Sequence, residues 1–133
     1  MAVAAAAAIA ASPGRPQGDA FLHELIAHVP ASQVHDGIAR AATVPPGAVA
    51  AAVRRLGNGS KISAQDTVAY CLWQAAYHLD DFSEAMWQTV SGGGDRDTTC
   101  AIVGGIVALA GPELPATWLE RREPLPEEIS RWQ

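Results

Sequence analysis

The chain turns at Ser91-Gly92-Gly93-Gly94-Asp95-Arg96-Asp97-Thr98-Thr99 and then runs from Thr98 to Ala110 without a charged residue. Glycine adopts left-handed backbone conformations that residues with a Cβ atom resist, so three in succession predict a tight loop. The uncharged run that follows is typical of a helix buried on every side. The sequence therefore predicts a sharp loop that places Asp95 and Asp97 at the start of a core helix.

Asp95 and Asp97 carry two carboxylates in one turn, and the hydroxyl of Thr98 stands beside the second. A helix N-terminus favours anionic oxygen, and hard cations such as Mg²⁺ or Mn²⁺ prefer ligands of this kind. Aspartate and threonine are also common helix caps, so the pair can equally serve only to cap the helix. Residue chemistry alone leaves both interpretations open.

Other ion and phosphate motifs do not fit this loop. An EF-hand starting at Asp95 would need glycine at its sixth position and glutamate at its twelfth, where the chain has Cys100 and Ile106. A P-loop needs a lysine after its glycines, and a dinucleotide fingerprint needs a preceding strand and G-x-G-x-x-G; neither is present.

The glycine loop carries a family resemblance. Gly93-Gly94-Asp95-Arg96-Asp97-Thr98, followed by Ala101-Ile102-x-Gly104-Gly105 and later by Gly111, Pro115 and Trp118, resembles the ADP-ribosylglycohydrolase family, whose members close with a Gly-Gly-Asp-x-Asp-Thr loop. Upstream, the run Ser63-Ala64-Gln65-Asp66-Thr67-Val68 and the pairs Asp81-Phe82 and Glu84-Ala85 resemble the last helices of that family. Matches in this order, over roughly the second half of the chain, are more specific than a single short motif.

The resemblance implies hydrolysis of the glycosidic bond between ADP-ribose and a modified acceptor. The family uses two Mg²⁺ or Mn²⁺ ions that hold the ribose hydroxyls and a water. Asp95, Asp97 and Thr98 match the metal ligands, with Asp97 expected to bridge both ions, while Gly93 and Gly94 shape the loop. The matched motifs do not decide whether the linkage is to arginine, serine or a small molecule.

The alanine-rich run 1–11 predicts a packing helix, because alanine has the highest helix propensity. It lacks the basic start of a signal peptide and is too short to span a bilayer. Within the resemblance it matches a helix that lies mid-domain. Residues 1–133 are therefore expected to form a single helical domain that lacks the family's N-terminal half. The catalytic residues and the remaining metal ligands are expected in that missing half. A partner segment would complete the domain.

A second class of function stays open, namely a non-catalytic helical interaction module in which the aspartates only cap a helix. Three oxygen ligands from one loop leave a six-coordinate ion largely hydrated, so we expect weak metal binding by this chain alone. The early Gly18-Asp19-Ala20 is not taken as the family's Gly-Asp-Ala segment. It stands in the wrong order, and Asp19 is explained as a helix cap.

Composition limits the partners. The chain has 133 residues, 49% of them hydrophobic, which suits one domain with a modest core. Its net charge is -5 and no basic cluster exceeds Arg54-Arg55 or Arg121-Arg122, so we expect no nucleic-acid backbone binding. We expect no membrane partner either. Cys71 and Cys100 fall among apolar neighbours, which favours reduced core thiols and a cytoplasmic protein.

Apolar residues recur at helical spacing along the rest of the chain, and no segment predicts a strand, so the expected fold is all-α, a compact orthogonal helical bundle. Tyr70, Trp73 and Tyr77 are expected in its core. The expected caps are Asp19, Ser32, Ser63 with Asp66, and Asp80 or Asp81. Helices are predicted over 19–29, 32–42, 49–56, 63–79 and 81–90, with a short turn at Pro115 and a last helix or loose end over 124–133.

Overall fold

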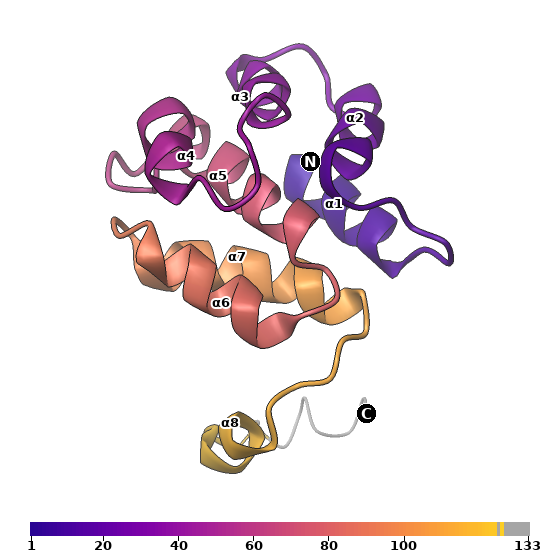
Figure 1. Cartoon of the computed structure of the whole chain (residues 1–133), viewed down its shortest axis with the longest axis vertical. Helices are drawn as coiled ribbons and strands as arrows, with labels where there is room; N and C mark the ends of the chain where they lie inside the picture. The colour runs from indigo at the N-terminus through magenta and orange to yellow at the C-terminus, as the bar shows by residue number, and fades with distance from the viewer. Residues whose placement is uncertain (125, 127–133) are drawn as a thin grey trace.

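The computed structural model describes residues 1–124 and 126, and all regular secondary structure in this part of the chain is helical. The predicted all-α class is therefore confirmed, and the helices pack as a bundle with crossing axes (Figure 1). The helices are α1 Ala2–Ala11, α2 Gly18–Ala27, α3 Gln33–Ala41, α4 Val49–Leu56, α5 Ala64–Tyr77, α6 Phe82–Ser91, α7 Arg96–Leu109 and α8 Ala116–Arg121.

Helix α5 is the centre of the bundle. It contacts α1, α2, α3, α4, α6 and α7, and it is buried along nearly its whole length after the first turn. Tyr70 and Trp73 lie fully in the core, as predicted, and Tyr77 packs edge-on against Trp73 from a less buried position. The Trp73 indole N–H donates to the carbonyl of Val44 at 3.1 Å, so its one polar atom is satisfied inside the core.

Helix α7 corrects the prediction of a helix buried on every side. Its buried residues are Thr99, Val103, Ile106 and Val107, and this face lies towards α1, α5 and α6. The opposite face is open, and Leu109 is 53% exposed. Alanine and glycine fill much of the open face, as at Ala101, Gly105 and Ala108. Such small side chains expose little apolar area, so the absence of charge does not require burial.

The alanine-rich α1 packs against α7, α2 and α5, as expected of a packing helix. Ala6 and Ala10 are buried, and Ile9 adds a larger apolar side chain to the same core. Small side chains let helix backbones approach closely, so the composition of α1 suits its position across α7.

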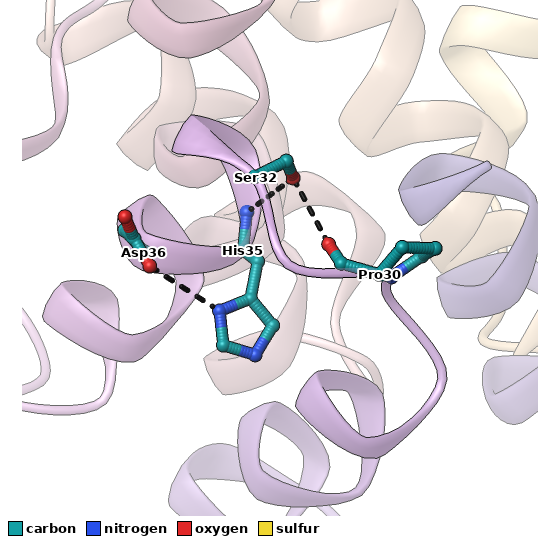
Figure 2. A network of polar contacts seen from close by, with 4 residues as sticks. All are labelled: Pro30, Ser32, His35 and Asp36. Atoms are coloured by element: carbon teal, nitrogen blue, oxygen red, sulfur yellow. Dashed lines mark hydrogen bonds and ion pairs between the residues drawn. The ribbon is translucent and has the colours of Figure 1, made fainter.

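Side-chain caps fix the starts of two helices as predicted. Figure 2 shows the start of α3, where the Ser32 hydroxyl accepts the backbone N–H of His35 at 3.2 Å and donates to the carbonyl of Pro30 at 3.1 Å. Asp81, the second of the two candidates, caps α6 by accepting the backbone N–H of Glu84 at 2.9 Å. Both bonds satisfy amide groups that a helix start leaves free.

Two other predicted caps are wrong. Helix α2 begins at Gly18 with Gln17 as its cap residue, and the carboxylate of Asp19 instead accepts the Tyr77 hydroxyl of α5. Ser63 precedes α5 but makes no side-chain cap, and Asp66 does not complete a capping box with it. The Asp19 carboxylate is thus used by another helix, and the Asp66 carboxylate accepts the N–H of Lys61 in the preceding loop.

Helix α8 stands apart from the bundle (Figure 1). Trp118 meets Phe82 and Trp87 of α6 edge-on, with ring centroids 6.2 Å apart in both pairs. The turn predicted at Pro115 is the start of this helix. Most of the segment 124–133 lies outside the described residues. None of the helices described is long and apolar enough to cross a membrane.

Candidate metal centre

The glycine loop joins α6 to α7 in a backbone conformation that glycine alone adopts readily. Gly93 and Gly94 have φ angles of 67° and 65°, both left-handed. A Cβ atom on Gly94 would also overlap the carbonyl oxygen of Asn58, which belongs to the loop between α4 and α5. Backbone conformation and close approach therefore both require glycine at position 94.

The loop between α4 and α5 braces the glycine loop, and the two lie side by side at one end of the bundle (Figure 1). The Asn58 carbonyl accepts the Asp95 N–H at 3.1 Å, and the Asn58 side chain donates to the carbonyl of Gly92 at 3.0 Å. A Cβ atom on Gly59 would lie 2.8 Å from the Cβ of Asp95. In the sequence, Asn58-Gly59 is typical of a helix stop, and nothing local marks this long-range approach.

Asp66 organises the bracing loop from the first turn of α5. Its backbone carbonyl accepts the N–H of Gly59 at 3.0 Å, and its carboxylate accepts the N–H of Lys61 at 2.9 Å. The side chain is only 8% exposed, so these bonds compensate for burying a carboxylate. Asp66 thus supports the candidate centre indirectly, through the loop that contacts Asp95.

Asp95 is the cap residue of α7. Its Oδ1 accepts the backbone N–H of Thr98 at 3.2 Å. The pKa of Asp95 is lowered by its interactions with the Thr98 hydroxyl, the Asp97 side chain and the Thr98 backbone N–H, in that order. Asp95 is half-buried, whereas Asp97 and Thr98 are exposed. The structure therefore gathers all three predicted ligand residues into one turn with access to solvent.

A hollow of about 320 Å³ opens beside this turn. Asp95 and Thr98 line it together with Thr67 of α5 and Ile102 of α7, whereas Asp97 is not part of the lining. Ile62 forms another part of the wall, with a left-handed φ of 51° and 91% exposure. A β-branched residue rarely adopts this conformation, so the backbone is strained at the edge of the hollow.

The donor set suits a hard cation only in part. Two carboxylates and a hydroxyl supply oxygen ligands, and capping by Asp95 leaves its Oδ2 and further lone pairs available. Within residues 1–124 and 126, no group of three or more histidine, cysteine, aspartate or glutamate side chains is placed to hold a metal ion. The turn thus offers three oxygen-bearing side chains but no larger group of metal-binding residues among those described.

The two cysteines are free. Burial raises the pKa of the Cys71 thiol to about 12, and the thiol donates a weak hydrogen bond to the Thr99 carbonyl at 3.8 Å. Burial and the neighbouring Asp97 raise the pKa of Cys100 as well. Both side chains are therefore thiols near neutral pH, which makes them poor nucleophiles and poor metal ligands.

Comparison with known proteins identifies the wider group. The sequence profile of the ADP-ribosylglycohydrolase family matches residues 1–132. The chain belongs to the ADP-ribosylglycohydrolase family. It is also 38% identical over 69 residues to a protein of Archaeoglobus fulgidus described as an uncharacterized protein. That alignment covers 52% of this chain and 22% of the archaeal protein, so the chain matches about a fifth of the relative. No solved structure matches significantly.

Membership of the ADP-ribosylglycohydrolase family agrees with the helical architecture, and it includes the alanine-rich α1 as well as the glycine loop. The resemblance first noted over the second half of the chain therefore extends to nearly all of it. Among the described residues, the turn at Asp95 is therefore the candidate functional site.

Proposed function

We propose that the chain supplies Asp95, Asp97 and Thr98 to a two-ion Mg²⁺ or Mn²⁺ centre of an ADP-ribosyl hydrolase. The observation that supports this most directly is that three residues with oxygen-bearing side chains lie in one turn at the start of α7, where Asp97 and Thr98 interact with Asp95. Bound ions would orient the ribose hydroxyls and a water and would neutralise developing negative charge. The substrate would be ADP-ribose attached to a protein side chain or a small acceptor.

The residues of this chain would have different roles at the metal centre. Asp95 keeps its carboxylate ionised, since its hydrogen bonds lower its pKa, and an ionised carboxylate is the form that binds a cation. Gly94 and the bracing Asn58 hold the backbone of Asp95 in place. Because three side chains leave most of the positions around two ions to other ligands, we infer that turnover needs further ligands from a partner segment outside these residues.

The free thiols of Cys71 and Cys100 support a reducing compartment, and we therefore propose a cytoplasmic location. A second candidate function is an interaction module without metal chemistry. Its support is specific, because Asp95 does cap α7 and the described residues hold no larger metal-binding group. Metal binding separates the two proposals.

The decisive experiment measures Mn²⁺ binding to this chain by electron paramagnetic resonance. We expect saturable, weak binding with a dissociation constant on the order of 1 mM, as for sites with few protein ligands. Asp97→Ala should abolish it. Asp36→Ala is the matched control, because Asp36 is an exposed acidic residue in the first turn of α3 and should be dispensable. Equal binding by wild type and Asp97→Ala would contradict the metal proposal and favour the interaction module.

A further inference from the structure

A second hollow, of about 470 Å³, is lined by the ends of α3 and α4 and by the bracing loop. It shares Ser63 with the hollow beside Asp95, and its remaining lining residues are different. Its lining concentrates positive charge in a chain whose net charge is -5. The cationic side chains are Arg40, Arg54, Arg55 and Lys61.

None of these four cations forms an ion pair with an acidic side chain in the part of the chain that the structure describes. Arg55 is held by Thr43, whose hydroxyl accepts from its guanidinium at 2.9 Å. The ion pairs present there are Arg15 with Asp80 and His35 with Asp36, and neither involves this hollow. Arg40, Arg54 and Lys61 are therefore free to bind another anion.

The hollow keeps a positive balance even though a carboxylate lines it. Asp66 is 8% exposed and its carboxylate already accepts the N–H of Lys61. The arginines occupy the last turns of α3 and α4, where cations favour the helix dipole. That preference explains each arginine on its own helix. It does not explain why two helices and a loop direct their cations to one hollow.

We propose that this hollow binds a diphosphate group. Guanidinium groups bind phosphate oxygens through paired N–H donors, and a lysine adds a compact charge. The hydroxyls of Ser60 and Ser63 offer further donors in the lining. The diphosphate can belong to a nucleotide sugar, in which case the inference rests on the proposed function, or to a free polyphosphate that binds independently of it.

The test is calorimetric titration of inorganic pyrophosphate into the chain, in a metal-free buffer of low ionic strength. We expect saturable binding that weakens as salt is added, because the cations are exposed. Removing two charge-assisted contacts in the double variant Arg40→Gln/Arg54→Gln should weaken binding roughly ten-fold. The double variant Arg121→Gln/Arg122→Gln makes the same charge change at the end of α8 and should bind as the wild type does.

Absence of saturable binding, or an equal loss in both double variants, would overturn the proposal. Circular dichroism of each variant checks that the helices are intact. Because no metal is present, Asp97→Ala should bind pyrophosphate normally, so this test and the Mn²⁺ test fail independently. Displacement of pyrophosphate by ADP-ribose would support a nucleotide-sugar diphosphate, and retention would support a free polyphosphate.

Discussion

At the level of single residues, the candidate centre depends on glycines that fit against a neighbouring backbone. Gly94 is left-handed and lies against the Asn58 carbonyl, whereas Gly105 lies on the open face of α7, where a Cβ atom would have no neighbour within 4 Å. A Cβ atom is therefore excluded at Gly94 but accommodated at Gly105, although both glycines belong to the same loop-and-helix unit. Replacing each glycine by alanine therefore distinguishes the effect of a close backbone contact from the effect of helix propensity.

Gly94→Ala should destabilise the protein by about 2 kcal/mol or more, because it adds left-handed strain and a backbone overlap. Gly105→Ala should stabilise it by roughly 0.5–1 kcal/mol, since alanine is the better helix former. Urea unfolding of both variants measures the free energies. A stable Gly94→Ala variant would contradict the bracing of Asp95 by Asn58.

At the level of helices, periodicity predicts where most elements lie but not which of them is central. The predicted and observed ranges agree closely for α3, α4 and α6. The prediction of burial on every side is wrong for α7, which has an open face although it carries no charge after Asp97, whereas the more polar α5 is enclosed. Gln74 of α5 is fully buried, and its amide donates to the Tyr70 hydroxyl at 2.9 Å. A polar residue with such a partner can occupy a core despite its polarity.

The candidate centre was predictable for the same local reasons, and only in part. Glycine, aspartate and threonine in one loop signal a turn, a cap and oxygen ligands. The bracing by Asn58 and Gly59 joins segments far apart in the chain, and no spacing rule anticipates it. The predicted helix cap at Asp19 is wrong for the same reason, because the Asp19 carboxylate accepts a hydrogen bond from the hydroxyl of Tyr77 on another helix.

The one-sided burial of α7 predicts a contrast between two aliphatic residues on the same helix. Ile106→Ala should cost about 2–4 kcal/mol, because Ile106 is 1% exposed and its loss leaves a cavity. Leu109→Ala should cost under about 1 kcal/mol, because Leu109 is already half in solvent. Denaturation midpoints of the two variants provide the comparison, and equal losses would restore the prediction of a helix buried on every side.

At the level of the whole molecule, α5 contacts six other helices. A charge that forms at its C-terminus should therefore affect the stability of the whole bundle. His78 caps the C-terminus of α5 and is partly buried. Burial lowers the pKa of His78, and the carboxylates of Glu84 and Asp81 offset part of that effect. Proton uptake by His78 is consequently less favourable in the folded protein than in the unfolded chain.

Folding stability should therefore respond to this histidine as the solution becomes acidic. The destabilising contribution is absent above the ordinary pKa of 6.5, and stability falls as the pH drops from there through the lowered folded-state pKa. His78→Gln should remove this component, so the stability difference between variant and wild type changes below 6.5 in favour of the variant. Glu84→Gln should enlarge the effect. Urea unfolding at about pH 7.5 and about pH 5 tests both.

The contact between Asn58 and Asp95 also carries an evolutionary consequence. The loop between α4 and α5 and the glycine loop are in close contact, so they cannot change length separately. An insertion in one would displace Asp95, which the contact with the other holds in position. Among homologous chains, indels in these two segments should be scarce, and where they occur they should come in matched pairs.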